Sequence, residues 1–132
     1  MRKIAKIGIA LVIIILMLFI TGKITVSRVE KNLISLQNSE LKTPSLTMVK
    51  DGTYSGSYTC FPVSVTVSVT VKDNTITDIA IIEHQNGQGK PAEKITDTVI
   101  EKQSITVDAV SGATYSSIVI LKAIENALAG SQ

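Results

Sequence analysis

The stretch Val63–Val71, VSVTVSVTV, decides the fold of this chain. Valine occupies every odd position of the run, and serine or threonine occupies every even position. Strict alternation of apolar and hydroxyl side chains is typical of a β-strand with one face in a core and the other in water. The sequence therefore predicts a half-buried strand at the centre of the folded unit.

The flanking segments extend this strand into an antiparallel sheet. Lys72–Thr75 supplies Asp and Asn for a turn, and Ile76–Glu83 returns as a second strand, which makes a hairpin. Upstream, Asp51–Tyr58 places two tyrosines among small polar residues and predicts a preceding strand. We expect a small antiparallel sheet.

Helices are predicted after the sheet. Pro91 suits the first residue of a helix that runs to about Lys102, with Ile95, Val99 and the stem of Lys102 on its inner side. Ile105–Val107 is expected to be a short extended piece.

A last helix is predicted from Tyr115 onward, with Gly130 as a candidate C-cap. Its apolar face has helical spacing and consists of Ile120, Leu121, Ile124, Ala127 and Leu128. The predicted fold class is therefore α+β, a small antiparallel sheet with helices packed on it.

A membrane anchor is predicted before this domain. Ile7–Gly22, IGIALVIIILMLFITG, carries no charge and lies between Lys6 and Lys23. As a helix it covers about 24 Å, and the flanking lysines can snorkel to complete a single membrane span. A cleaved signal peptide is the alternative, and Thr25 and Ser27 fit its cleavage site loosely. We expect the amino terminus in the cytoplasm and the domain on the extracytoplasmic side.

Three parts follow from this pattern: a membrane anchor at residues 1–22, a juxtamembrane stalk or linker at 23–48, and a domain at 49–132. Thr43–Ser45 is expected to end the stalk helix. The stalk carries an apolar stripe that predicts either a face resting on the domain or membrane, or a dimer seam. The stripe consists of Val26, Val29, Leu33 and Leu36.

Composition excludes several classes of function. The segment from Val49 to Gln132 has six basic and nine acidic residues, so it offers no basic surface for nucleic acid. The chain has one cysteine, Cys60, and one histidine, His84. An internal disulfide and a zinc site built from Cys and His are therefore not expected.

The segment Val107–Ser117, VDAVSGATYSS, places Thr114 at the start of the last helix. A helix start has free N–H groups and a partial positive charge, which suits a phosphate. From the residues alone, Ser111 or Thr114 could equally be a simple helix cap.

The same segment resembles a known family. Asp108, two spacers, Ser111, Gly112, Ala113 and Thr114 match the pattern Asp-x-x-Ser/Thr-Gly-Ala-Thr/Ser of FMN-binding domains of the kind found in RnfG and NqrC subunits. The resemblance covers about residues 49–130. It implies FMN joined to Thr114 through a phosphoester, added by a magnesium-dependent flavin transferase that uses FAD as donor.

The resemblance also suggests roles for the neighbouring residues. Gly112 and Ala113 leave space for a phosphate close to the backbone. Asp108 braces the turn or is recognised by the transferase, with a plain Asx-turn as the alternative. Ser111 caps or hydrogen-bonds, and His84 contacts the flavin edge or lies on a surface loop. Thr59–Pro62 replaces the family's glycine-rich turn, so the family's ring contacts do not transfer to this chain.

The resemblance implies a membrane-anchored electron-transfer flavoprotein rather than a stand-alone enzyme. Its expected partners are the lipid bilayer, the flavin transferase, and a membrane-bound or extracellular redox partner. Two alternatives stay open: a regulatory module that binds flavin without a covalent bond, and a structural surface domain without cofactor.

A dinucleotide fingerprint is the rival motif. Gly87, Gly89 and Ala92 fit Gly-x-Gly-x-x-Gly/Ala, but polar residues separate these glycines from the preceding strand, and the domain is too short for a doubly wound sheet. We interpret Asn86–Lys90 as a flexible loop.

Overall fold

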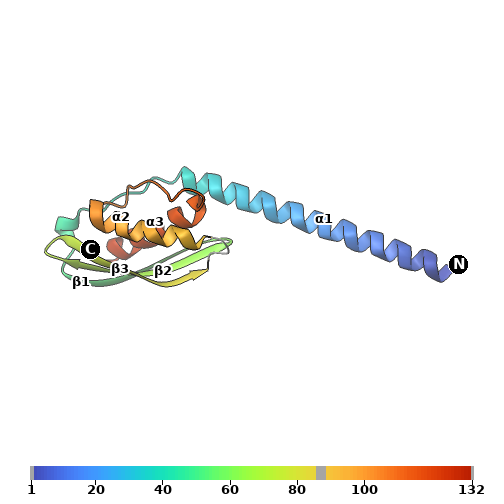
Figure 1. Cartoon of the computed structure of the whole chain (residues 1–132), viewed down its shortest axis with the longest axis horizontal. Coiled ribbons are helices and arrows are strands. Elements are labelled where there is room, and N and C mark those ends of the chain that lie inside the picture. Colours follow the sequence, from blue (N-terminus) through green and yellow to red (C-terminus); the bar gives the residue numbers. More distant parts are fainter. Residues whose placement is uncertain (1, 86–88, 132) are drawn as a thin grey trace.

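The computed structural model describes residues 2–85 and 89–131, and it contains a long helix followed by a small α+β domain (Figure 1). The sheet is antiparallel with strand order β1-β2-β3. The predicted fold class is confirmed. The elements in chain order are α1 (Arg2–Gln37), η1 (Leu46–Met48), β1 (Gly52–Cys60), β2 (Val63–Lys72), β3 (Thr75–Gln85), η2 (Lys90–Lys94), α2 (Ile95–Lys102) and α3 (Thr114–Ala129).

The alternating stretch forms the central strand, β2, as predicted. All five valines are buried and the hydroxyl residues between them are half-exposed. Helix α3 lies on the valine face, and the five residues of its predicted apolar face are all buried. The core is therefore a layer of valines beneath a layer of helix side chains.

A two-residue turn joins β2 and β3 into a hairpin. Asp73 and Asn74 both have positive φ values, 51° and 60°. Two such residues are typical of a type I′ turn, whose twist matches that of the strands it joins. The predicted turn at Lys72–Thr75 is confirmed, with Asp73 and Asn74 as its two central residues.

Strand β3 carries two irregularities that change which side chains face the core. The register shifts between Thr70 and Val71 and again between Thr66 and Val67 of the partner strand. Thr77 and Ile82 are the extra residues, because neither has a partner in β2. The bulges bury Ile79 and expose Ile82.

The region after β3 differs from the sequence expectation in three details. Pro91 lies in η2, and α2 begins only at Ile95. Lys102 is exposed, so the prediction that its stem packs inward is wrong, whereas Ile95 and Val99 are buried as predicted. Ile105–Val107 adds no strand to the sheet, although the Ile105 side chain fills a place in the core.

The end of α3 fits the predicted cap in position only. Gly130 is the C-cap residue, and its φ of −70° is right-handed. The left-handed conformation that favours glycine at helix ends is therefore not used here.

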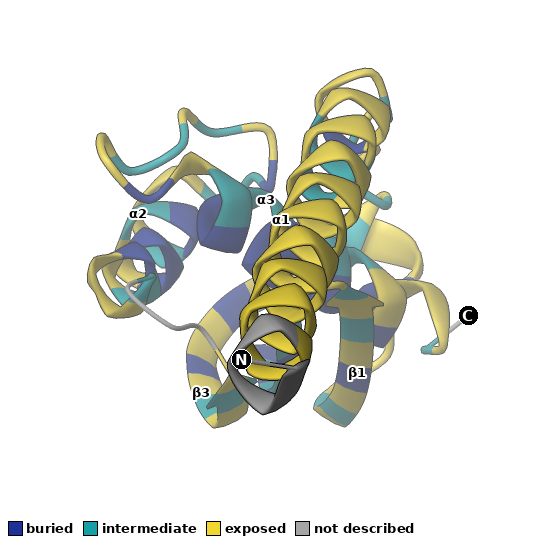
Figure 2. Ribbon diagram, turned by 90° about the vertical axis from the view of Figure 1, so that its right-hand side faces the viewer, coloured by how far each residue is buried: buried dark blue, intermediate teal, exposed yellow. Residues whose placement is uncertain are grey.

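Helix α1 runs without interruption from the apolar segment into the stalk. Its span Lys6–Gln37 is long and apolar enough to cross a membrane, with a mean hydropathy of 2.7 in its most apolar window. Figure 2, viewed from the amino-terminal end of α1, shows its surface exposed along most of its length. It ends at Gln37, earlier than the predicted break at Thr43–Ser45.

The last turns of α1 rest on the domain. Leu36 is buried in the core, and Val29 and Leu33 are half-buried. Val26, the first residue of the predicted stripe, remains exposed. The prediction of a stalk face resting on the domain is thus confirmed for Val29, Leu33 and Leu36.

The segment between α1 and β1 is tied to the domain by hydrogen bonds. The Lys42 backbone N–H donates to the Glu125 carboxylate (3.0 Å), and the Ile105 N–H donates to the Thr43 hydroxyl (3.3 Å). Val49 is buried. The division at residues 22 and 48 remains a prediction, since packing continues across the second boundary.

Candidate functional site

The motif turn places Thr114 at the first position of α3. Ala113 is the N-cap residue, and Gly112 has a φ of 78°, a left-handed conformation that favours glycine. Thr114 is exposed. Its hydroxyl is therefore attached to a helix start and accessible from solvent.

The start of α3 is open to an anion. Within residues 2–85 and 89–131, no side chain caps the helix, so the interpretation of Ser111 or Thr114 as a simple cap is wrong. The N–H groups of the first helical turn have no carbonyl four residues back in the helix to bind. A Cβ added at Gly112 would meet no atom within 4 Å. This combination of free N–H groups and open space suits a phosphate.

A serine that the sequence analysis did not single out braces the turn. The buried Ser117 hydroxyl accepts a hydrogen bond from the Val110 N–H (3.0 Å) and donates one to the Ala113 carbonyl (2.8 Å). Its position could have been noticed in the sequence, because Ser117 is a hydroxyl residue on the apolar face of the predicted last helix. Ser117 therefore has the role that we predicted for Asp108.

Asp108 and Ser111 are both exposed. Neither makes a hydrogen bond with any residue that the structure describes, so the predicted bracing by Asp108 and the predicted hydrogen bonding by Ser111 are not found. Transferase recognition by Asp108 stays a prediction. The Asp108 carboxylate has no contact with a described residue that would indicate another role.

A cavity of about 260 Å³ lies beside the turn. Its walls come from four parts of the chain: α1, the start of β2, the segment before η2, and the start of α3. The lining residues are Val29, Pro62, Val63, Gly89, Gly112, Tyr115 and Ser116. Sequence reasoning did not place Val29 at a site, named Gly89 only in the rival dinucleotide fingerprint, and named Pro62 only in the segment that replaces the family's glycine-rich turn. Only the tertiary fold brings these residues to Gly112.

The residues that replace the glycine-rich turn hold α3 against the β1–β2 turn. The Tyr115 hydroxyl donates to the Phe61 carbonyl (2.7 Å) and contacts Cys60 Sγ at 3.2 Å. Burial of the phenol, with the neighbouring Cys60, raises the pKa of Tyr115. The Asn32 side chain of α1 donates to the same carbonyl (3.2 Å). Three elements therefore meet at Phe61.

His84 lies away from the cavity lining. It is paired with Val65 in the sheet, its side chain is 2% exposed, and its Nδ1 is 3.0 Å from a Glu93 carboxylate oxygen. The alternative of a surface loop histidine is wrong, because β3 extends to Gln85 and residue 84 pairs with the buried Val65. A flavin-edge contact stays a prediction. The predicted flexible loop at Asn86–Lys90 falls mostly outside the described residues.

The fold and this site define a class of protein: a small α+β domain with a phosphate-compatible helix start, attached to a helix that can cross a membrane. The family model for the FMN-binding domain matches residues 62–129, which is more than half of the 132-residue chain. The chain belongs to the FMN-binding domain family. No curated protein matches it.

The residues present fit FMN. The open space at Gly112 and the uncapped start of α3 suit the phosphate, and the exposed Thr114 hydroxyl lies at the same place. The cavity next to Gly112 is walled in part by Val29, Pro62 and Val63. Apolar walls beside a polar end match a ligand with a flat aromatic ring and a phosphate.

Proposed function

We propose that this protein is a membrane-anchored flavoprotein that carries FMN on Thr114 through a phosphoester and transfers electrons on the extracytoplasmic side. The donor is a membrane reductase, and the acceptor is an external molecule or partner protein. The observation that carries the proposal is the exposed hydroxyl of Thr114 at an uncapped helix start, next to the open space at Gly112.

The attachment step is a phosphoryl transfer from FAD. The Thr114 oxygen forms a bond to the phosphorus of the FMN half, the bond from that phosphorus to the bridging oxygen breaks, and AMP leaves with that oxygen. A base of the transferase takes the hydroxyl proton. The N–H groups at the start of α3 favour the negative charge that the phosphoester retains.

The role in electron transfer rests on where the site lies. The cavity includes Val29 of α1, so the site is at the end of the domain from which the anchor leaves (Figure 1). Bound flavin supplies one- and two-electron chemistry. A carrier fixed near the bilayer has a high effective concentration for membrane partners, and no tight partner site is required.

Labelling of Thr114 variants tests the attachment. The full chain is expressed with a flavin transferase and exported, and flavin fluorescence is measured on a denaturing gel. We expect a fluorescent wild type, no label in Thr114→Ala, and at least partial label in Thr114→Ser because the nucleophile remains. Ser111→Ala is the matched control: its hydroxyl is exposed three residues away, and its label should equal that of wild type. Label on Thr114→Ala would overturn the assignment.

Electron transfer and sidedness need their own measurements. The attached flavin should bleach on chemical reduction and recover on reoxidation, and a flavin that does not cycle would favour a regulatory module.

Protease added to intact cells should remove the domain from the membrane fraction. Protection in cells whose envelope is permeable to the protease would contradict the extracytoplasmic orientation.

A further inference from the structure

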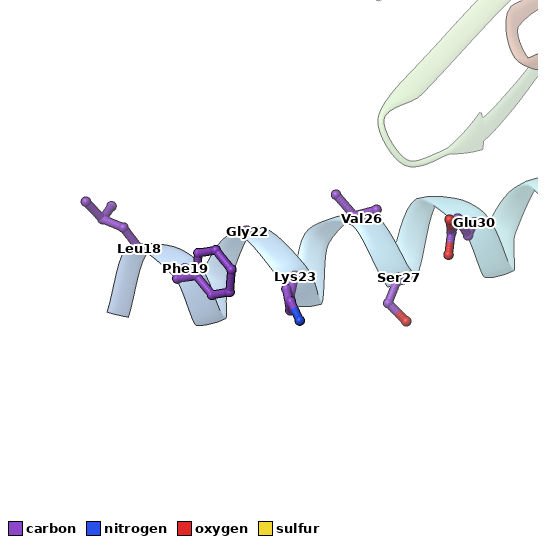
Figure 3. A pocket seen from close by; sticks show the side chains of 7 residues that line it. All are labelled: Leu18, Phe19, Gly22, Lys23, Val26, Ser27 and Glu30. Carbon is purple, nitrogen blue, oxygen red and sulfur yellow. The ribbon is translucent and has the colours of Figure 1, made fainter. Parts of the chain in front are cut away.

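A second cavity lies between α1 and the β1–β2 turn, apart from the flavin site. Its volume is about 250 Å³, and its lining residues are Ile24, Thr25, Arg28, Asn32 and Phe61. It shares no lining residue with the cavity next to Gly112. Another hollow on α1, shown in Figure 3, is lined only by residues of that single helix and offers no enclosed site.

Phe61 combines a fixed backbone with an exposed ring. Its carbonyl accepts hydrogen bonds from Tyr115 of α3 (2.7 Å) and Asn32 of α1 (3.2 Å). The residue is nevertheless 59% exposed. Two elements therefore position an aromatic ring that packs against little of the protein itself.

With α1 spanning the membrane as in the proposed function, the position of the cavity along this helix places it at the surface of the bilayer. The uncharged run ends at Gly22, and Ile24 and Arg28 follow Lys23 by one and five residues. At 1.5 Å per residue, Arg28 lies about 8 Å beyond Lys23. Each headgroup layer of a bilayer is about 5–8 Å thick. Phe61 lines the same cavity as Ile24, and its carbonyl is bound by Asn32, about 14 Å beyond Lys23, so its ring lies between these two levels.

The chemistry of the cavity matches a phospholipid headgroup. Arg28 is exposed and makes no ion pair or hydrogen bond with any residue in the described ranges. A guanidinium binds phosphate with two parallel hydrogen bonds. Ile24 and Phe61 supply apolar walls of the kind that enter the boundary between headgroups and acyl chains. Lys23 on the same helix adds positive charge, opposed by Glu30.

We propose that this cavity binds the headgroup of an anionic phospholipid and that the Phe61 ring enters the membrane interface. This contact docks the domain on the bilayer in which α1 is anchored, and it rests on the membrane anchorage in the proposed function. The flavin site then faces the bilayer at a fixed height, because Tyr115 joins the lining of the flavin cavity to the Phe61 carbonyl.

A tryptophan probe tests the docking, since the chain contains no tryptophan. Full-length Phe61→Trp is reconstituted in vesicles of phosphatidylcholine alone or with equal parts phosphatidylglycerol, each containing acyl-brominated lipid. We expect blue-shifted emission at residue 61 and strong quenching by bromine near the headgroup end of the acyl chain. Met48→Trp is the matched control: it is 71% exposed and lies at the opposite end of the sheet, near the Asp51–Asp73 hydrogen bond. It should not be quenched.

Substitution of Arg28 gives a second test of the proposal. Phosphatidylglycerol should increase quenching at residue 61, and Arg28→Gln in the Phe61→Trp background should remove at least half of that increase. Lys31→Gln, which removes a charge outside the cavity lining, should keep most of it. An increase that survives Arg28→Gln would overturn the headgroup assignment.

Flotation of the same vesicles separates the two proposals. Protein that floats with lipid while its residue 61 probe is unquenched would overturn the docking and leave the anchor intact. Protein that does not float would overturn both. A blue shift that grows with protein density and shows no bromine quenching would assign the surface to a second copy of the chain and contradict lipid binding.

Discussion

At the scale of single residues, the site depends on how the turn before α3 is held. Ser117 bonds both the Val110 N–H and the Ala113 carbonyl from a buried position, whereas Asp108 and Ser111 face solvent. The turn that leads into Thr114 is therefore held by Ser117, a residue of α3 three positions after Thr114.

Ser117→Ala should loosen this turn. The change leaves the Val110 N–H without its acceptor, and an unsatisfied buried donor costs about 1–3 kcal/mol. Thermal unfolding of the full chain in detergent measures the loss, and flavin labelling of Thr114 should fall with it. The control is Ser116→Ala: this residue is also buried, but its hydroxyl makes no hydrogen bond with a described residue, so the free energy of unfolding should change by less than about 1 kcal/mol. Equal losses in the two variants would refute the bracing role.

At the scale of elements, the domain depends on close contact between α3 and β1. Gly56 is buried, and a Cβ at this position would collide with the Ala123 carbonyl and the Ala127 backbone. Backbone atoms cannot move aside by changing rotamer. The helix therefore lies on the strand only because residue 56 has no side chain.

Gly56→Ala should destabilise the domain by about 1–3 kcal/mol through overpacking. Gly52→Ala is a matched change in the same strand, where the added atom would meet only the movable Tyr54 side chain at 3.3–3.7 Å. We expect a loss below about 1 kcal/mol for that variant. Chemical denaturation of the full chain compares the two, and a Gly56→Ala protein as stable as Gly52→Ala would contradict the packing account.

Most of the sheet and α3 could be predicted because their patterns are local. The alternation of β2, the Asp73–Asn74 turn and the apolar face of α3 each reflect neighbours within one element. Strict alternation in β3 from Ile76 would place Asp78 and Ala80 inward and Ile79 outward. The bulge at Thr77 reverses this, the bulge at Ile82 reverses it again, and both arise from fitting β3 to β2. His84 was not placed in the sheet because the predicted strand ended at Glu83, whereas β3 extends to Gln85.

The candidate site was predictable in its motif and not in its surroundings. Thr114 and Gly112 stand in one short segment whose turn and helix start are visible in the sequence. Val29, Pro62 and Gly89 reach the same cavity from three other segments. These three residues lie together only because of the path that α1 takes out of the domain, and no local sequence pattern predicts that path.

At the scale of the whole molecule, helix α1 and the domain form one continuous body. Helix α1 has 36 residues and is about 54 Å long. Its last turns enter the domain core through Leu36, and the exposed Asn32–Phe61 hydrogen bond ties them to the β1–β2 turn. Val29 lies six residues beyond Lys23, about 9 Å along the helix. If α1 spans the bilayer, the candidate site is therefore held close to the membrane surface, as the proposed transfer from a membrane reductase requires.

The most direct test of the central claim is peptide mapping of the protein from its native membranes. Trypsin cleaves after Lys102 and Lys122, and no lysine or arginine lies between them, so one peptide, Gln103–Lys122, contains the whole motif. We predict that this peptide carries the mass of one FMN less one water and that fragmentation assigns the added mass to Thr114. An unmodified peptide, in membranes where the transferase labels a control protein, or an added mass on any other residue would contradict the account.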